Sequence, residues 1–204
     1  MNKIVVMAAF AAFLSTPALA QDVSGAEKTP FNGPFVGAVL GYDNARGHVP
    51  GGPSTTRDGL LYGGTLGYDK NFNGAVVGVE GEYTDSNTKY NAADVLTAGD
   101  GVSLNTGRDL YAGARVGGQV SKNILLYAKG GYTNQRIAQY YSSGGATTRT
   151  AFDLDGYRLG AGVETTYHGL TGRLEYRYSN YGKDLAPGIN TERHQVAAVV
   201  GYRF

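Results

Sequence analysis

The sequence predicts an all-β fold, namely an eight-stranded antiparallel up-and-down transmembrane β-barrel. Three observations support this fold. Apolar and polar residues alternate with period two along eight segments, which is typical of strands with one apolar face. The connections between these segments are alternately long and short. The composition includes 32 Gly, 16 Tyr and no Cys, so the chain has neither a disulfide framework nor a thiolate metal site.

The first twenty residues predict a secretory signal peptide. Lys3 gives a short positive start, residues 4–14 form an apolar core, and Ala18-Leu19-Ala20 matches a cleavage site. We therefore expect cleavage after Ala20. The predicted organisation is a signal peptide at 1–20, a short disordered polar lead-in at 21–33 and a barrel domain at 34–204.

The first three strands are predicted at 35–44, 59–69 and 75–85. In each strand, large apolar or aromatic residues alternate with glycine or polar residues. The third strand shows this most clearly, because Glu80 and Glu82 share one face. A Gly/Pro-rich loop at 45–58 and a short turn at 70–74 are expected between these strands.

The next three strands are predicted at 108–120, 124–137 and 153–167. Their apolar faces carry mainly Leu, Ala, Val and Tyr, while their other faces mix charge with glycine. Polar composition predicts long loops at 86–107 and 138–152. A minimal turn joins the fourth strand to the fifth.

The last two strands are predicted at 171–181 and 192–204. A short turn precedes the first of them, and a loop containing Pro187 and Gly188 precedes the second. The chain ends on Phe204, at the end of an alternating apolar series. Closure of the barrel requires 192–204 to pair with 35–44, because no open sheet edge survives in hydrocarbon.

The polar faces are predicted to line the lumen, and the apolar faces to contact lipid. A soluble β-sandwich or lipocalin-like barrel would have the opposite arrangement, with charge outside. Glycine is frequent beside the charged residues, which suits an eight-stranded lumen that holds only side chains. Tyrosines also cluster near the expected strand ends, where an interfacial girdle belongs.

Several segments resemble one family. These are FNGPFVGAVLGY, VVGVEGEYTD, LYAGARVGGQVSKNILLYAKGGY, LGAGVETTY with LTGRLEYRYSNYG, and the terminal VVGYRF. Together they resemble the small eight-stranded OmpA-type and opacity-type barrels, in particular the porin-family surface proteins of alphaproteobacteria. No segment of this sequence resembles the peptidoglycan-binding domain that OmpA itself carries after its barrel.

The resemblance implies a location in the Gram-negative cell outer membrane, with the lead-in on the periplasmic side. It implies contact with outer-membrane lipid and lipopolysaccharide. It also implies recognition of the last strand by the barrel-assembly machinery, with Val200, Tyr202 and Phe204 as the assembly signal.

The inward faces supply the main candidate site, a ladder of ion pairs in the lumen. An isolated buried ion costs several kcal/mol, so these charges are expected to pair. The predicted network consists of Glu80, Glu82, Arg115, Lys129, Arg158, Glu164, Arg173, Glu175 and Arg177. Two interpretations stay open: a plug that fills the lumen, and an ion-pair gate in a narrow, low-conductance channel.

The surface loops are the second candidate site, because binding residues are often carried by loops on a rigid scaffold. His48, Tyr90 and Tyr140 are candidate contacts for haemin or a host factor, alongside the simpler interpretation that they are solvated loop residues. The sequence thus predicts a structural surface protein, with a surface receptor as the alternative.

Other function classes are not predicted. Lipid A enzymes among small barrels use a His and a Ser, yet none of the three histidines here lies in an H-x-S pattern. No cluster of metal ligands and no cofactor motif is evident. A net charge of +1 gives no electrostatic reason to expect nucleic acid binding.

Overall fold

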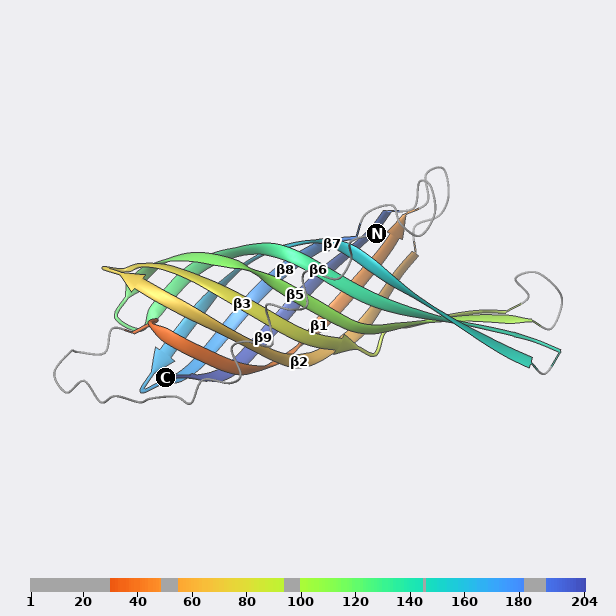
Figure 1. Ribbon diagram of the computed structural model, residues 1–204, viewed down its shortest axis with the longest axis horizontal. Coiled ribbons are helices and arrows are strands. Elements are labelled where there is room, and N and C mark those ends of the chain that lie inside the picture. The colour runs from red at the N-terminus through yellow and green to blue at the C-terminus, as the bar shows by residue number, and fades with distance from the viewer. Residues whose placement is uncertain (1–29, 49–54, 94–99, 145, 182–189) are drawn as a thin grey trace, which may run out of the picture.

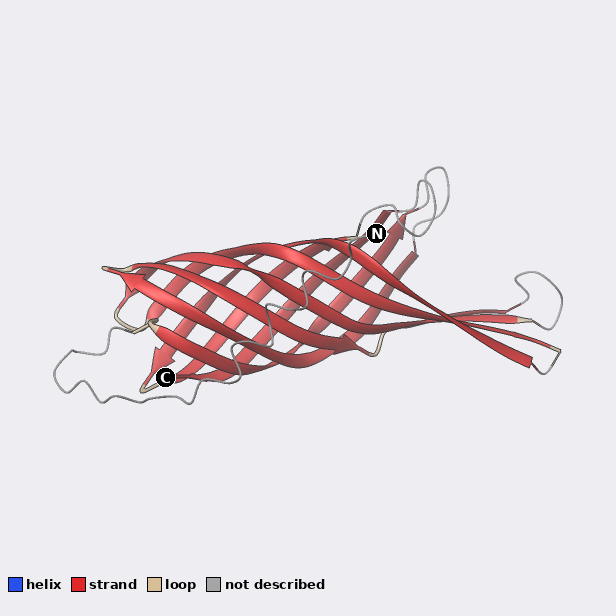
Figure 2. Ribbon diagram, in the orientation of Figure 1, coloured by secondary structure: helices blue, strands red, loops and turns tan. Residues whose placement is uncertain are grey.

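The computed structural model describes residues 30–48, 55–93, 100–144, 146–181 and 190–204, and Figure 1 traces the others in grey. The predicted signal peptide and most of the lead-in lie outside the described residues. Strands make up nearly all of the described chain (Figure 2). No described helix has the length and hydropathy needed to cross a membrane.

The described strands form one antiparallel sheet that closes on itself. Their order is β3-β2-β1-β9-β8-β7-β6-β5-β4, and β3 also pairs with β5. β4 continues the position of β3 after a break at Asn87 and Thr88, so the ring has eight positions. This confirms the predicted eight-stranded barrel. The bounds are β1 Gly33–His48, β2 Thr55–Phe72, β3 Ala75–Ser86, β4 Lys89–Ala93, β5 Gly101–Ser121, β6 Ile124–Ser143, β7 Ala146–Tyr167, β8 Leu170–Asn180 and β9 Asn190–Arg203.

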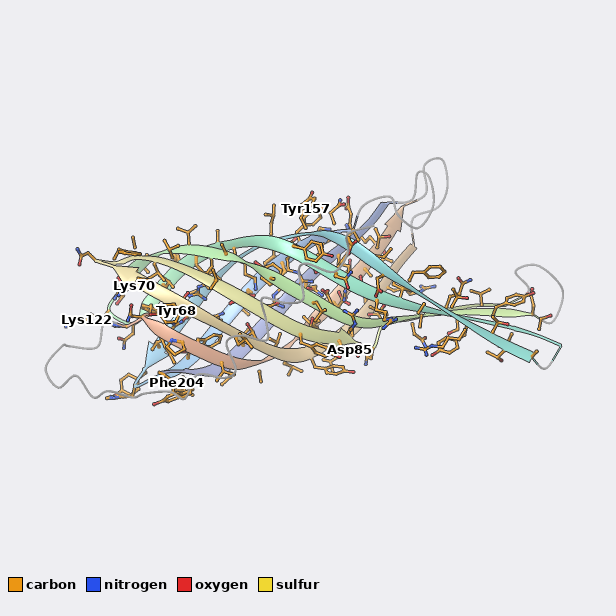
Figure 3. The ribbon with its side chains drawn as sticks, in the orientation of Figure 1. Tyr68, Lys70, Asp85, Lys122, Tyr157 and Phe204 are labelled. Atoms are coloured by element: carbon orange, nitrogen blue, oxygen red, sulfur yellow. The ribbon has the colours of Figure 1, made fainter. Side chains whose placement is uncertain are left out.

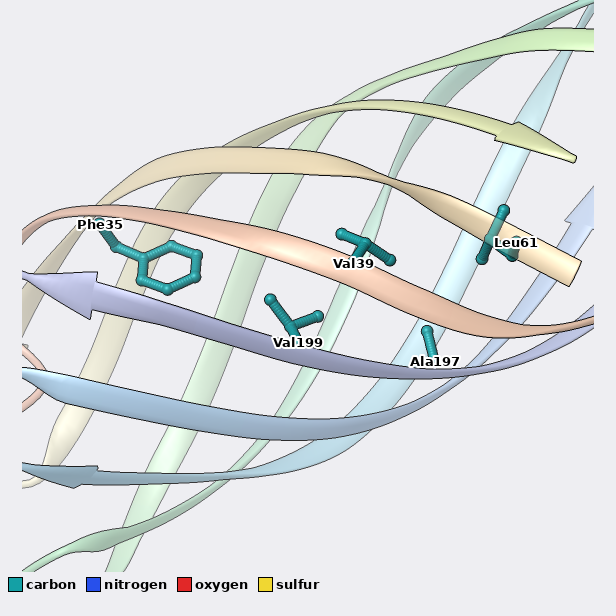
Figure 4. Packing of buried hydrophobic residues seen from close by; sticks show 5 residues of the cluster. All are labelled: Phe35, Val39, Leu61, Ala197 and Val199. Atoms are coloured by element: carbon teal, nitrogen blue, oxygen red, sulfur yellow. The ribbon is translucent and has the colours of Figure 1, made fainter.

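Pairing of the first strand with the last closes the ring, as predicted. β1 and β9 pair from Phe35↔Arg203 to His48↔Asn190 without a register shift. Beneath this seam lies a small cluster of buried apolar side chains, shown in Figure 4. The cluster consists of Phe35, Val39, Leu61, Ala197 and Val199. The seam is thus sealed by backbone hydrogen bonds and by apolar contacts on the lumen side.

The outer face of the barrel is apolar, as the alternation predicts. Most of its Leu, Val and Tyr side chains are about half exposed, while the alternate residues are buried. Tyrosines lie near both ends of the wall. Tyr68, Tyr167 and Tyr202 lie near one end, and Tyr42, Tyr62, Tyr83, Tyr132, Tyr157 and Tyr176 lie near the other. Such belts suit the two membrane–water interfaces.

Three two-residue turns gather at one end of the barrel, which we call the turn end. They lie at Asn73–Gly74, Lys122–Asn123 and His168–Gly169. In the first and third, both residues have positive φ, as tight hairpin turns require. Both ends of the barrel domain also lie here, since the Phe204 amide donates to the Pro34 carbonyl at 3.0 Å. The short connections of the sequence thus lie at the same end of the barrel as Pro34 and Phe204.

Two predicted loops are wrong. Residues 101–107 and 138–143, together with 146–152, are strand, so β5, β6 and β7 continue together beyond the barrel (Figure 1). We call this part, with β4, the extension. A register shift between Thr106 and Asp109 marks where it leaves the barrel. The polar composition of these segments predicted loops. The extension lies beyond the barrel, where water can surround a strand, so its strands can carry polar residues.

The lead-in also differs from prediction where it is described. Pro30, Phe31 and Asn32 were expected in a disordered segment, yet Asn71 holds them: its Nδ2 donates to the Pro30 carbonyl at 2.9 Å. The Phe31 ring is fully buried with Val76 and Leu125 inside the turn end of the lumen. The lead-in around Phe31 is mostly polar, so its sequence did not predict that the Phe31 ring would be buried.

The seam provides a test of ring closure. A Cβ added at Gly201 would lie 2.2 Å from the Val36 carbonyl oxygen, whereas one at Gly118 would meet nothing within 4 Å. Gly201→Ala is therefore expected to reduce the yield of heat-modifiable, folded barrel on gels, because β1 and β9 would have to separate. Gly118→Ala is the control and should fold normally. Equal folding of both variants would contradict the close approach at the seam.

Candidate functional site

The lumen holds a set of buried charges that balances to zero. Among the described residues, seven acidic and seven basic side chains are at most 5 % exposed within the barrel. The acids are Asp43, Asp69, Glu80, Glu82, Asp109, Glu164 and Glu175. The bases are Arg115, Lys129, Arg158, Arg173, Arg177, Arg193 and Arg203. Figure 3 shows the described side chains along the strands of the barrel.

Near the turn end, the network is centred on Glu164 of β7. One of its oxygens lies 2.5 Å from Arg115 and 2.9 Å from Arg173, and the other lies 2.6 Å from Arg203. Arg115 and Arg203 also contact Asp69 of β2, at 3.1 and 2.7 Å. Side chains from five different strands thus meet in one layer.

In the middle of the lumen, three carboxylates surround one ammonium group. Lys129 Nζ of β6 lies 2.7 Å from Glu80, 2.6 Å from Glu82 and 3.0 Å from Glu175. The three carboxylate groups lie within 4.8 Å of one another, close enough to hold a metal ion. Lys129 supplies positive charge at their centre, so the residues present form an internal ion-pair cluster.

Toward the extension, the network continues through Arg158 of β7. It lies 3.3 Å from Glu82 and 2.5 Å from Asp109. Asp109 also contacts Arg193 at 3.1 Å, and Arg193 in turn pairs with Asp43. Every member of the set is therefore linked through shared partners into one continuous network that crosses the lumen.

Inward aromatic rings share this space with the cations. The Arg173 guanidinium lies 3.8 Å from the centre of the Phe35 ring, and Arg115 lies 4.4 Å from the centre of Tyr127. Glycines leave room for these rings, because a Cβ at Gly37 would lie 2.8 Å from Phe35. Glycine on the polar face thus lets a ring lie flat against the wall beneath a cation.

The structure brings all nine predicted network residues together in the lumen. The predicted network lacked five members, which form the contacts at its two ends: Asp43, Asp69, Asp109, Arg193 and Arg203. Asp43 and Asp69 each directly follow an outward-facing tyrosine. The period-two alternation could therefore have predicted that both carboxylates lie in the lumen. Phe31 had no such signal, because it precedes the first strand.

The three loop candidates lie in strands, which corrects their expected placement. His48 is the last residue of β1, Tyr90 lies in β4 opposite Leu104, and Tyr140 lies in β6 opposite Ser103. The side chains of His48 and Tyr90 lie outside the described residues. Tyr140 is half-buried, and the Arg149 guanidinium lies 5.8 Å from its ring centre.

The end of β9 presents an aromatic pair to the outside. Val200, Tyr202 and Phe204 are exposed on the lipid-facing side, and the Tyr202 and Phe204 rings lie 5.1 Å apart. Their role as an assembly signal stays a prediction. Elsewhere on the outer face, His194 Nδ1 lies 2.6 Å from the Tyr176 hydroxyl, and no described serine joins this pair.

The sequence matches the model of one protein family over nearly its whole length. Residues 6–204 match the model of the outer membrane protein beta-barrel domain. The chain belongs to this family. Its barrel is thus an outer-membrane barrel, in agreement with the apolar outer wall and the two belts of tyrosine. A search of curated proteins finds no match.

Solved structures with a similar fold include two bacterial surface proteins. Ail, the attachment invasion locus protein of Yersinia pestis, is 18% identical, with a TM-score of 0.50, over 84% of this chain and 99% of Ail. Neisserial surface protein A is 16% identical, with a TM-score of 0.53, over 85% of this chain and 98% of that one. At such identities the likeness shows the shared barrel fold alone.

The centre of the network gives a stability prediction. Lys129→Met removes the ammonium group but keeps the side-chain volume, which leaves three neighbouring carboxylates without their shared partner. Breaking a buried ion pair in this way costs about 3–5 kcal/mol. We expect a loss of this size in the free energy of unfolding, measured by urea titration of the refolded barrel. Because the chain contains no Trp, unfolding is followed by gel migration and not by tryptophan fluorescence.

Lys122→Met is the matched control, since Lys122 lies exposed in the β5–β6 turn (Figure 3). This variant should unfold like the wild-type protein. Equal midpoints for Lys129→Met and Lys122→Met would show that the Lys129 cluster does not stabilise the barrel.

Proposed function

We propose that this chain is a structural surface protein of the outer membrane whose lumen is closed. The observation that carries this proposal is the continuous, charge-neutral network of fourteen buried side chains across the lumen. Eight strands leave room for side chains only, and here long Arg, Lys and Glu side chains occupy that room. Such a barrel would contribute rigidity to the envelope and hold the extension at the cell surface.

The orientation follows from the turns. Short turns face the periplasm in outer-membrane barrels, and long connections face outward. The turn end would therefore lie in the periplasm, and the extension would project from the cell. On this basis the outer wall contacts outer-membrane lipid, and its outer tyrosine belt contacts lipopolysaccharide.

Assembly is a further part of the proposal. The aromatic end of β9 would be recognised by the barrel-assembly machinery, after cleavage of the signal peptide behind Ala20. The outward placement of Val200, Tyr202 and Phe204 supports this role, because those side chains are accessible before lipid covers them. The end of β9 also belongs to the closing seam, so recognition and closure involve the same strand.

A narrow, low-conductance porin is the closest competing function. It would require the ion pairs to separate and reform as a solute passes. Each arginine and lysine of the network contacts two or three carboxylates, so the opening of a path breaks several buried pairs at once. This cost favours the closed lumen. The proposed role is not enzymatic, and no cofactor takes part in it.

A surface receptor is the second candidate, and the extension is the observation that favours it. Its two faces differ: Val102, Ile137 and Phe152 lie on the face that continues the lumen side. Tyr140 and Arg149 lie on the opposite face, which is more polar. A protruding sheet with an apolar face is suited to binding a partner, such as haemin or a host factor.

Electrical recording distinguishes a closed lumen from a porin. Purified protein, inserted into a planar bilayer, is expected to give no stepped current at neutral pH, because paired side chains fill the lumen. A known open porin, recorded in the same bilayer, is the positive control. Reproducible current steps that disappear when the protein is left out would contradict the closed lumen and support the porin.

A further inference from the structure

A cluster of polar side chains lies on the outer wall, just beyond the outer tyrosine belt. Tyr132 of the belt lies opposite Tyr157, which Figure 3 labels on the outer face. Arg136 lies opposite Asp153, four residues further along β6 and β7. The cluster lies at the base of the extension and comes from three strands: Arg108 from β5, Asn134 and Arg136 from β6, and Asp153 and Asp155 from β7.

A β-bulge brings Arg108 into this cluster. The register of β5 and β6 shifts here, so two residues, Gly107 and Arg108, oppose the single residue Arg136. A Cβ at Gly107 would lie 3.1 Å from the Arg136 carbonyl oxygen, so the bulge packs closely against β6. Arg108 points along the outer face, where its Nη1 donates to Asn134 Oδ1 at 3.2 Å. Both guanidinium groups thus come near the same carboxylate, that of Asp153.

The two arginines are held loosely. Arg108 Nη2 lies 3.5 Å from Asp153 Oδ1, and Arg136 Nε lies 3.8 Å from the same oxygen. The side chains of Arg136 and Asp153 are about half exposed, and exposed pairs of this kind stabilise a protein little. Among the described residues, this is the only ionic contact of Arg136. Most of its five N–H groups are therefore available to a ligand.

The contacts of the arginines leave an excess of positive charge. Arg108 and Arg136 share the single carboxylate of Asp153, and the other partner of Arg108, the Asn134 amide, is neutral. Asp155 accepts hydrogen bonds from Tyr132 and, at 2.6 Å, from Asn134 Nδ2. Within the described part of the chain, the arginines thus contact one acid for two bases. Such a site suits an anionic ligand.

The cluster lies at the level of lipid headgroups. Four residues of a strand span about 13 Å, and a strand tilt of about 40° places the Arg136 backbone about 10 Å above that of Tyr132. Tyrosine belts mark the membrane–water interface, and a long arginine side chain beyond such a belt can extend along the wall to a headgroup. The molecules that lie against this part of the wall are therefore the lipids of the outer leaflet.

We propose that this cluster binds the headgroup of a phosphorylated glycolipid in the outer leaflet. Arg108 and Arg136 bind the phosphate, because planar guanidinium groups pair with phosphate oxygens through parallel N–H···O bonds. Asp153 accepts a hydrogen bond from a sugar hydroxyl beside that phosphate. The inference rests on the proposed surface orientation, and it deepens the proposed lipid contact by assigning residues to it.

Native mass spectrometry tests the site. The full-length mature chain is refolded in neutral detergent and mixed with purified lipid A that carries its phosphates. The wild-type protein is expected to retain the lipid. Arg108→Gln with Arg136→Gln should weaken binding by at least about tenfold, because charge-assisted hydrogen bonds to phosphate are lost. Unchanged binding by this folded double variant would overturn the site.

A charge-matched control uses two exposed arginines away from the cluster. Arg149 lies on the same face of β7, four residues beyond Asp153 and further from the membrane, and Arg57 lies on β2. Arg57→Gln with Arg149→Gln removes the same total charge and should bind lipid A like the wild-type protein. A tenfold loss in this control would show that net charge, and not the cluster, holds the lipid.

The choice of ligand tests the chemistry. Dephosphorylated lipid A should bind the wild-type protein about tenfold more weakly than the phosphorylated form. Phosphatidic acid has a phosphate but no sugar, so Asp153→Ala should reduce the preference for lipid A over this lipid. Inorganic phosphate at the concentration of lipid A should displace none of it. Equal binding with and without the phosphates would contradict the proposal, and so would displacement by inorganic phosphate or an unchanged preference in Asp153→Ala.

The outcomes separate this inference from the proposed function. Heat-modifiable migration shows independently that each variant is folded. If the double variant does not fold, Arg136→Gln alone carries the test, since this half-exposed side chain contacts only Asp153 among the described ionic groups. Its unchanged binding would overturn the site and leave the closed lumen intact. Current steps in the planar bilayer, together with normal lipid retention, would overturn the closed lumen and leave the lipid site intact.

Discussion

Charge neutralisation inside a narrow barrel is the constraint on which the rest of the structure depends. A buried ion costs several kcal/mol unless opposite charge and hydrogen bonds accompany it. The lumen holds fourteen such ions among the described residues, and they come from every strand position of the ring. Glu164, for example, on β7, needs arginines from β5, β8 and β9. The pairs can form only when the strands close in the observed register.

This constraint links the glycines, the rings and the ions. Glycine at Gly37 and Gly201 lets β1 and β9 approach closely and leaves space for the Phe35 ring. The Phe35 ring then packs against the Arg173 guanidinium, which forms salt bridges with both Glu80 and Glu164. A lumen built in this way has little room for a continuous column of water. On the proposed function, the same residues stabilise the fold and keep the barrel closed.

Much of this could be predicted from the sequence, because a barrel in lipid imposes a strict period of two. Alternation placed Glu80, Lys129 and Arg173 inside, and it placed Tyr202 outside. Beyond the membrane that constraint ends, so residues 138–143 and 146–152 resembled loops although they form strands. Period alone also gives no pairing partners. Contacts such as Arg193 with Asp43 depend on the register around the whole ring, as does the position of Phe31.

The central claim, that the lumen is sealed around its ions, can be tested by amine labelling. Folded protein in detergent or vesicles is treated with a small water-soluble amine reagent, and the labelled lysines are identified by mass spectrometry. The exposed Lys70 and Lys122 should react, whereas Lys129, which is 4 % exposed, should react only after denaturation. Equal labelling of Lys129 and Lys122 in the folded barrel would contradict a closed lumen.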